Sequence, residues 1–404
     1  MLHKLLVAAL FCLTLGGCFH VQLTGSVGNA TLSISPLRNP EQVLASATSF
    51  GPAQWIANMG QEKWDEQSSF VQLLSVGMTR PDIPDLDPDA LYLVTASGGE
   101  DYDPNGKLEM SSNPETVQGS WHAIVSGQRI MDGNLKVTAL SEAIYQQFRM
   151  RFDQWSDEEL ELRLEAMAQV LITDVDDSGS VDYNDVLDYS RSIDGDAFLG
   201  NLNKLDALAA AVAAGQPDSS LQSQAEAAIG RTNVELTFDA GVVTLRTFNW
   251  DAPITVANFL GYVRSGFYDN MLVHRAINNF MIQMGGFAVV GEDEQGRLDI
   301  ERKETGAAII NESSNGISNT RGTLSMARTS NPDSATSQFF INQVNNNFLD
   351  FASFQNPDGY AVFAKVTSGL EVVDEIAAEP TTSVSGIGND VPARGVVLEM
   401  AREL

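Results

Sequence analysis

The spacing of hydrophobic residues changes twice along this 404-residue chain. Residues about 19–145 alternate apolar and polar positions with a period of two, which predicts strands, as at Ala30–Ile34 and Trp121–Val125. Residues about 140–230 change to a helical period, and after Gly230 short strands and tight turns return. Because this length allows two or three domains, the changes of period predict a multidomain chain.

The expected domain boundaries follow these changes in pattern. We expect a signal peptide, a β-rich and sandwich-like domain, a helical region and a second β domain at 1–17, 18–145, 146–230 and 231–404. Within the helical region, Ser156 lies three residues before Glu159, which forms a capping box and predicts the start of a helix. Further helical stretches are expected at about 197–214 and 221–229.

The first eighteen residues have the pattern of an export signal. A short polar and basic start precedes an apolar run from Leu5 to Leu15, which is too short to span a bilayer as a helix. The run leads into Leu15–Cys18, which resembles the lipobox of bacterial lipoproteins. The resemblance implies acylation of Cys18 and a membrane anchor of several acyl chains. Since Phe19 follows the cysteine, it also implies the outer membrane, facing the periplasm. A plain secretory signal with an incidental cysteine is the alternative.

Charge and cysteine content limit the partners. The chain carries 24 Lys and Arg against 53 Asp and Glu, a formal net charge of −29, and most of the excess lies before residue 231. An acidic surface repels phosphate backbones, so we expect no nucleic-acid partner. The only other cysteine, Cys12, lies in the signal segment, so the mature chain would have no thiol for a disulfide.

Five segments of the last domain carry a resemblance to a known family. They are Val273–Gly286, Gly322–Arg328, Ser337–Asn342, Asn347–Asp350 and Tyr360–Val366. In this order they resemble the signatures of the cyclophilin family of peptidyl-prolyl cis/trans isomerases, and five ordered motifs are far more specific than one. The resemblance implies an eight-stranded antiparallel β-barrel with two capping helices, which we expect at about 253–264 and 370–378.

The resemblance also implies which residues carry catalysis. Rotation about an Xaa-Pro bond breaks amide resonance, a barrier of about 18–20 kcal/mol. A donor aimed at the prolyl nitrogen binds the twisted state better than the planar states and lowers that barrier. By resemblance Arg275, whose guanidinium stays charged, is this donor, and Phe280 and Gln283 complete the catalytic set. The implied substrate-binding residues are Met281, Ala327, Arg328, Gln338, Phe340, Phe348, Leu349 and Tyr360. Catalysis of this kind needs no cofactor.

Periodicity alone leaves other interpretations open for these residues. Periodicity alone favours barrel core for Phe280, Phe340 and Leu349. Arg275 and Gln283 lie in apolar strands, where an unpaired polar group is costly, and this favours a function for them. We expect His274 to be structural rather than catalytic.

Three positions depart from many eukaryotic cyclophilins. Phe348 stands in place of Trp, Tyr360 in place of His, and Arg328 in place of Asn. Bacterial members share this pattern, so the departures concern binding of the inhibitor cyclosporin rather than activity.

A second resemblance lies in the helical region. The segment from Asp174 to Asp185 is similar to an EF-hand calcium loop, with Gly179 at the sharp turn and helical stretches on both sides. The expected Ca²⁺ ligands are Asp174, Asp176, Ser178, Ser180 through its carbonyl, Asp182 and Asp185. Asp185 stands where Glu is usual, which weakens binding. An acidic turn without an ion is the alternative, and for the similar segment Asp101–Ser112 an Asx turn is favoured over a weak ion site.

The sequence therefore predicts an exported, lipid-anchored isomerase that acts on proline-containing unfolded or extended polypeptides of the bacterial cell envelope. Two alternatives remain. One is a module that binds proline peptides with little turnover. The other is an adhesion or scaffold lipoprotein in which the N-terminal region is the working part.

Overall fold

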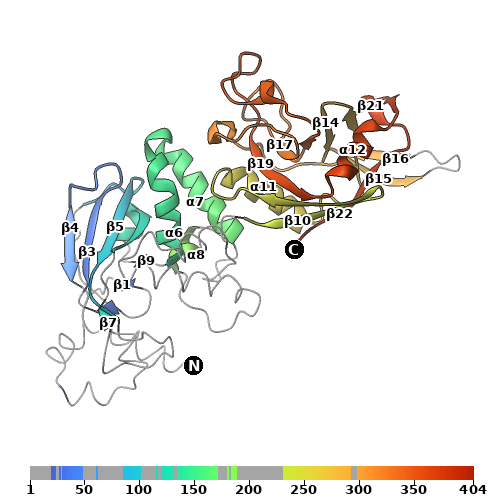
Figure 1. The fold of residues 1–404 in the computed structure, drawn as a ribbon. Coiled ribbons are helices and arrows are strands. Elements are labelled where there is room, and N and C mark those ends of the chain that lie inside the picture. Colours follow the sequence, from blue (N-terminus) through green and yellow to red (C-terminus); the bar gives the residue numbers. More distant parts are fainter. Residues whose placement is uncertain are drawn as a thin grey trace. The chain divides into compact units, whose positions relative to one another are not determined.

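The structure, a computed structural model, describes residues 20–23, 27–28, 30–48, 61, 85–101, 115–116, 120–131, 134–137, 139–171, 180–181, 183–188, 231–292 and 298–404. The chain divides into two units, one of Met1–Leu164 and Ile172–Ala228 and one of Glu165–Leu171 and Ile229–Leu404 (Figure 1). Each unit is described by itself. Over the described residues, no helix combines the length and the hydropathy that crossing a membrane requires.

The first unit is β-rich, with α5 between its last two strands and the other helices after β9, of which α7 continues into the second unit. Its elements are β1 His20–Leu23, β2 Val27–Gly28, β3 Thr31–Pro36, β4 Ala45–Thr48, β5 Leu91–Ser97, β6 Glu100–Asp101, β7 Glu115–Thr116, β8 Ser120–Ser126, α5 Gly127–Met131, β9 Asn134–Val137, α6 Ala139–Phe148, the 3-10 helix η1 Arg149–Gln154, α7 Asp157–Leu171 and α8 Tyr183–Asp188. The largest sheet is antiparallel in the order β4-β3-β5-β8, while β1 pairs with β9 in parallel and β2, β6 and β7 form a small third sheet.

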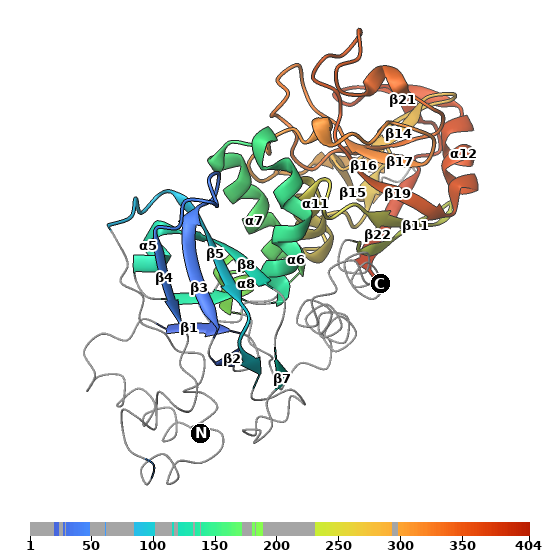
Figure 2. The same ribbon diagram turned by 60° about the vertical axis from the view of Figure 1, so that its left-hand side comes forward.

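Helix α6 packs against β8, the edge strand of the largest sheet of the first unit (Figure 2). The side chain of Glu142 on α6 is buried and accepts hydrogen bonds from the backbone N–H (2.6 Å) and Nδ1 (2.8 Å) of His122 on β8. The ring of Tyr145, one turn further along α6, stacks on that imidazole at 4.2 Å. The prediction of a β-rich region is confirmed, and its finer form as a sandwich stays a prediction.

The predicted capping box is present at the start of α7. The backbone N–H of Glu159 donates to Ser156 Oγ (3.1 Å), and the backbone N–H of Ser156 donates to the Glu159 carboxylate (3.0 Å). Two of the N–H groups that a helix start leaves unpaired are thereby satisfied. The helical stretches expected at 197–214 and 221–229 lie outside the described residues.

The second unit is built on one large antiparallel sheet whose strands differ in length. Its elements are β10 Asn233–Phe238, β11 Gly241–Thr247, α11 Pro253–Arg264, β12 Met271–Leu272, β13 Arg275–Ile277, β14 Met281–Met284, β15 Phe287–Glu292, β16 Leu298–Arg302, η2 Ser313–Asn315, β17 Thr323–Met326, β18 Phe339–Asn342, η3 Asn347–Leu349, β19 Val362–Ser368, α12 Leu370–Ala378, β20 Thr381–Val384, β21 Gly388–Pro392 and β22 Val397–Glu403. Eleven strands are hydrogen-bonded in the order β13-β14-β18-β17-β19-β11-β10-β22-β12-β15-β16, and β20 and β21 form a separate hairpin.

The sheet differs from the predicted closed eight-stranded barrel. It has eleven strands, and within the described residues its two end strands, β13 and β16, do not pair with each other. Several of these strands are only two to five residues long, because the chain turns sharply between motifs. The two predicted helices are confirmed as α11 and α12 with the expected bounds.

One apolar core unites the sheet and both helices of the second unit. Phe259 on α11 is fully buried, and its ring lies 5.5 Å from Tyr268, 5.4 Å from Phe339 and 5.0 Å from Phe363. Such tilted and edge-to-face aromatic pairs add to the free energy gained by burial. Val373 on α12 belongs to the same core. The core therefore fixes the strands that bear the signature motifs.

The start of α11 depends on a carboxylate from elsewhere in the unit. Ala252 occupies the N-cap position and has no side chain that can cap. Instead, the buried Glu312 accepts hydrogen bonds from the backbone N–H (2.8 Å) and the hydroxyl (2.8 Å) of Thr255, and from the N–H of Ile254 (3.4 Å). A negative charge at a helix N-terminus is favourable because it meets the positive end of the helix dipole.

We therefore expect Glu312→Gln to lower the free energy of unfolding by about 1–2 kcal/mol, since it removes the charge from this cap. Chemical denaturation of the two proteins measures the difference. Glu301→Gln is the matched control, because Glu301 is exposed on β16. Equal losses in the two variants would show that the carboxylate at the helix start adds nothing.

Candidate active site

The alternation of side chains on the paired strands β14 and β18 separates the core of the second unit from a small second apolar cluster. On β14, Ile282 and Met284 point into the main core, whereas Met281 belongs to the second cluster. On β18, Phe339 and Ile341 are core residues, whereas Phe340 belongs to the second cluster. Alternate residues of a strand face opposite sides of the sheet, so the hydrophobic period of two builds both clusters at once.

The second cluster and the residues packed against it are called the pocket, because the family resemblance places the proline ring there. Met281, Phe340 and Leu349 are buried at its base, with 1%, 5% and 8% of their surface exposed. The half-buried residues packed against them are Ile277, Phe280, Ala327 and Tyr360. Two of its rings pack edge to face, with the ring centres of Phe340 and Tyr360 5.7 Å apart. All five motif segments contribute a residue to this pocket.

Arg275 lies at the rim of this pocket. It begins β13 and pairs with Gln283 on β14, and its guanidinium carbon is 5.9 Å from the centre of the Phe280 ring. The side chain is 44% exposed, and its Nε is 3.7 Å from a carboxylate oxygen of Asp390 on β21. An ion pair that long and that exposed is weak. The guanidinium is therefore aimed over the pocket and remains able to donate.

Two glutamines lie on the site side of the neighbouring strands. Gln283 is opposite Phe340 in the strand register, and its Nε2 donates to Gln338 Oε1 at 3.0 Å. Gln338 also lies close above Gly286, where an added Cβ would be 2.8 Å from the amide nitrogen of Gln338. The structure thus brings Arg275, Gln283 and Gln338 together beside the apolar cluster.

The side chain of Arg328 holds the loop that precedes Tyr360. Its guanidinium carbon lies 4.6 Å from the centre of the Tyr360 ring, its Nε donates to the carbonyl of Gly359 (3.0 Å), and its Nη2 donates to Asn356 (2.8 Å). The resemblance assigns substrate binding to the backbone at Ala327 and Arg328, and this stays a prediction.

A network of buried amides lies behind the pocket. Asn346 donates to the carbonyl of Phe280 (2.9 Å) and to Asn342 (2.8 Å), and Asn342 in turn donates to Asn319 (3.2 Å). Asp350 completes it by accepting from the backbone N–H of Asn319 at 2.6 Å. Burial raises the pKa of Asp350, but the hydrogen bonds from Ser318, Asn319 and Asn347 outweigh it and hold that pKa below its usual range. These residues join segments far apart in sequence, and only the motif positions of Asn342 and Asp350 hinted at them.

His274 is held neutral next to Arg275. It has only 7% of its surface exposed, and its ring meets Phe287 edge-on at 5.2 Å. Burial lowers the pKa of His274 to about 4, and hydrogen bonds to Gln338 and to the Leu272 backbone offset this only in part. A neutral imidazole behind the strand does not donate a proton at neutral pH, which agrees with the predicted structural role.

The predicted calcium ligands fall almost entirely outside the described residues. This applies to Asp174, Asp176, Ser178 and Asp182, while Ser180 is described as exposed and Asp185 is described only as part of α8. Where the structure does describe side chains, no three His, Cys, Asp or Glu gather as a metal site would need. Cys18 and most of Asp101–Ser112 also lie outside the described residues.

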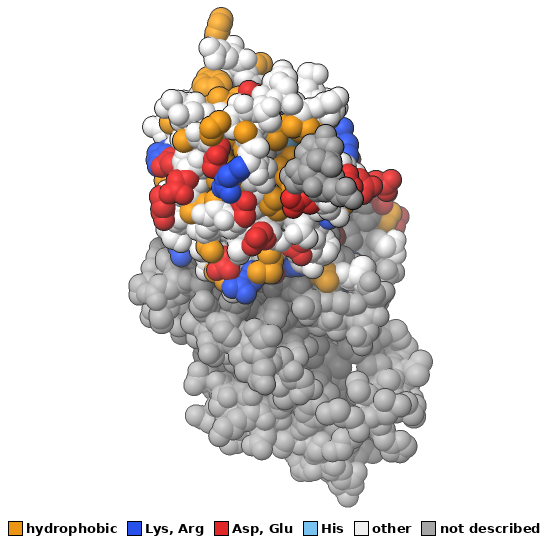
Figure 3. Space-filling view, turned by 90° about the vertical axis from the view of Figure 1, so that its right-hand side faces the viewer, with side chains coloured by type: hydrophobic (Ala, Val, Ile, Leu, Met, Phe, Trp, Pro, Cys, Tyr) orange, Lys and Arg blue, Asp and Glu red, His pale blue; other side chains and the backbone are white. Residues whose placement is uncertain are grey.

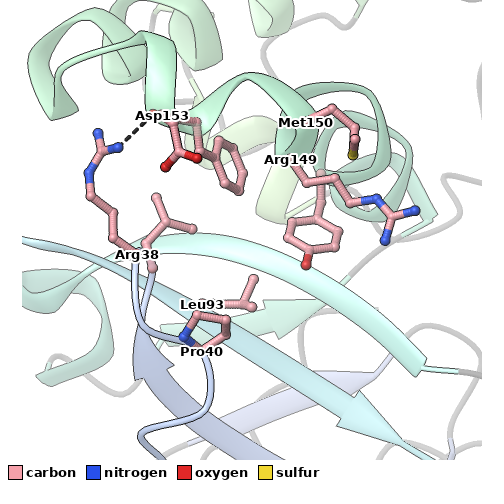
Figure 4. Close-up of a pocket in the computed structure, with 9 residues that line it drawn as sticks. Arg38, Pro40, Leu93, Arg149, Met150 and Asp153 are labelled. Carbon is pink, nitrogen blue, oxygen red and sulfur yellow. Dashed lines mark hydrogen bonds between the residues drawn. The ribbon is translucent and has the colours of Figure 1, made fainter.

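The first unit has a hollow of its own. It has a volume of about 280 Å³ and is lined by Leu37, Arg38, Pro40, Leu93, Tyr145, Arg149, Met150, Phe152 and Asp153 (Figure 4). Arg38 is held there by Asp157 at 2.7 Å and by the backbone carbonyl of Trp155 at 2.7 Å. None of the residues that the sequence marked for a function lines this hollow.

An apolar cluster with a guanidinium at its rim has the groups that proline isomerisation requires. By the family resemblance the proline ring would contact Met281, Phe340 and Leu349, and Arg275 would donate to the nitrogen that becomes pyramidal as the amide twists. The fold and the site together define a cyclophilin-like isomerase domain.

Comparison with known proteins gives the same result. Residues 233–402 match the family model described as cyclophilin type peptidyl-prolyl cis-trans isomerase/CLD. A peptidyl-prolyl cis-trans isomerase of Acinetobacter baylyi is 48% identical over 42% of this chain and 84% of its own length. Peptidyl-prolyl cis-trans isomerase B of Escherichia coli is 50% identical over 39% of this chain and 92% of its own length. A solved cyclophilin type isomerase of Cryptosporidium parvum, 23% identical, covers 43% of this chain and 98% of its own with a TM-score of 0.34.

The chain belongs to the cyclophilin-type peptidyl-prolyl cis-trans isomerase family through its second unit. It is a peptidyl-prolyl cis/trans isomerase, as the five ordered motifs predicted.

Arg275→Ala should lower kcat/KM on a short Xaa-Pro peptide about a hundredfold or more, because it removes the donor to the twisted state. A coupled or spectroscopic assay of proline isomerisation measures it. Arg246→Ala, which removes an exposed arginine of β11, serves as the control and should keep full turnover. Normal turnover by folded Arg275→Ala protein would place catalysis elsewhere.

The low pKa of His274 predicts a loss of stability in acid. The unfolded chain protonates this histidine near its ordinary pKa of 6.5, whereas the folded chain does so near 4. The unfolded state therefore binds the extra proton first, and the stabilising effect of the neutral imidazole is complete above pH 6.5 and is lost as the pH falls towards 4. We therefore expect the protonation of His274 to lower the free energy of unfolding by about 2 kcal/mol between pH 7 and pH 4.5.

Chemical denaturation of the wild-type and His274→Asn proteins across this pH range tests the expectation. The free energy of unfolding of the variant should fall by about 2 kcal/mol less than that of the wild type. Identical pH dependence of the two proteins would contradict it.

Proposed function

We propose that this isomerase acts on Xaa-Pro bonds of exported polypeptides and assists their folding in the cell envelope. The enzymatic part rests on one observation, the position of Arg275 at the rim of the apolar cluster of Met281, Phe340 and Leu349. The export part is supported by the sequence alone, where an apolar run precedes Cys18. Substrates in this proposal are unfolded or extended chains, because an open pocket for a single ring requires the flanking peptide to lie along the surface.

Turnover is favoured over simple binding of proline peptides. A binding module needs the pocket alone, whereas this site adds a charged donor, Arg275. The carboxylate of Asp390 lies 3.7 Å from its Nε and is itself partly exposed, so it pairs only weakly with the guanidinium. Such a donor strengthens its interaction as the amide nitrogen gains its lone pair, which is the condition for catalysis. The scaffold alternative is favoured by no contact in the described residues.

The anchor is proposed at Cys18. We expect Cys18→Ser to abolish acylation and to release the exported chain from membranes, because the acyl chains supply the membrane affinity. Fractionation of cells and mass spectrometry of the mature N-terminus measure this. Cys12→Ser, which lies in the signal segment, is the matched control and should leave the anchor intact. A mature chain whose unmodified N-terminus lies after residue 18 would contradict the proposal.

A Ca²⁺ site is proposed at 174–185. The structure supports the proposal only in that α7 precedes this segment and α8 begins within it. Carboxylates gathered in one turn repel each other, and a bound Ca²⁺ relieves that repulsion. Binding to the folded state alone then stabilises the protein by RT ln(1 + [L]/Kd).

Millimolar Ca²⁺ should therefore raise the melting temperature, and Asp174→Ala should remove the rise. Differential scanning calorimetry with and without a chelator measures it, and Asp153→Ala, an exposed aspartate of η1, is the control. The isomerase rate should change little on chelation, because none of the predicted calcium ligands belongs to the pocket. Calorimetry that finds no Ca²⁺ binding would leave the segment an acidic turn.

A further inference from the structure

Three phenylalanines are exposed on one loop beside the proline pocket. Phe348, Phe351 and Phe354 have 42%, 53% and 104% of their surface exposed. Among the described residues no other phenylalanine is exposed. On the face of the second unit drawn in Figure 3, hydrophobic side chains also project at the upper end. Single exposed apolar residues are ordinary, but three large aromatic ones within seven residues make this loop a candidate binding surface.

The loop that carries these rings is fixed rather than loose. Ser353 Oγ donates to the carbonyl of Phe348 (2.8 Å) and accepts from the backbone N–H of Asn356 (3.1 Å), and the N–H of Ala352 donates to the carbonyl of Pro357 (2.9 Å). Gly359 has a φ of +57° and packs so closely that a Cβ would lie 2.5 Å from the nitrogen of Phe351. The loop backbone is therefore already ordered, and little conformational entropy would be lost when a partner covers the rings.

The exposed rings continue the proline pocket. The ring of Phe348 stacks on that of Phe280 at 5.7 Å, with an interplanar angle of 24°. The next residue, Leu349, is one of the three buried residues at the base of the pocket. A chain whose proline fills the pocket thus has an aromatic surface directly beside it.

We propose that the surface formed by Phe348, Phe351 and Phe354 binds apolar side chains that flank the proline in an unfolded polypeptide. This inference rests on the proposed function and adds the class of substrate, namely Xaa-Pro segments with large apolar neighbours. Each ring that a substrate covers removes roughly 150–250 Å² from contact with water. Burial of apolar surface is favourable wherever it occurs, so such segments bind more tightly than polar ones.

Charge favours a polypeptide over a lipid surface as the occupant. The stretch 347–359 contains Asp350 and Asp358 and no Lys or Arg. Segments that insert into membranes carry basic residues beside their apolar ones, because bacterial lipid surfaces are anionic. The low pKa of Asp350 keeps this carboxylate charged and repelled from such a surface.

The test compares the KM of three peptides with a common Ala-Pro core, using the full-length chain with Cys18→Ser. One peptide has serines on both sides, and the others carry Phe-Leu-Phe before or after the core. We expect one of the apolar peptides to have a KM about tenfold lower than the serine peptide at similar kcat, since the flank binds ground and transition states equally. Phe351→Ser combined with Phe354→Ser should remove that difference and leave the serine peptide unaffected.

Val290→Ser is the matched control, because Val290 is 55% exposed on β15 and should leave the tenfold preference unchanged. Equal KM values for all three peptides, or a preference that survives the double substitution, would overturn the inference while the isomerase function stands. Absence of turnover on the serine peptide would refute the proposed function, and this inference with it. Sedimentation with phosphatidylethanolamine–phosphatidylglycerol vesicles that requires Phe351 and Phe354 would assign the surface to lipid and likewise overturn it.

Discussion

The isomerase site depends on the register between β14, β18 and β17. Gln283 lies opposite Phe340, and Phe340 lies opposite Ser325, so the pocket side of three strands is aligned. A slip of one residue would turn Ile341 to the pocket and Phe340 into the core, because side chains alternate along a strand. The register is held by Asn342, which is fully buried on the pocket side and donates to the Thr323 hydroxyl at 3.0 Å. In any other register this amide would be buried without its partner, at a considerable cost.

Local signals in the sequence identified several elements correctly. Pro253 predicted the start of α11 because proline at the first turn loses no hydrogen bond. Ser156 and Glu159 predicted the start of α7 because both members of the cap lie within four residues. The pocket residues Met281 and Phe340 followed from the family resemblance, whereas periodicity alone did not distinguish them from core.

Other features depend on residues distant in sequence and could not be predicted in this way. A period of two shows that a strand has one buried face but not what covers it, so α6 was not foreseen on the first sheet. The cap of α11 by Glu312 and the approach of Asp390 to Arg275 each join separate segments. The side chain of Arg328 donates to Gly359 and Asn356, and nothing in its motif indicates these partners. Only the fold determines which atoms a long side chain reaches.

The position of β22 has a consequence for the cooperativity of folding. This strand lies inside the sheet between β10 and β12 and pairs with both. Without β22 the sheet would divide into two pieces, one that ends at β10 and one that begins at β12. The two pieces share their core only when residues 397–403 are in place, so the strands that bear the site gain their order together rather than one after another.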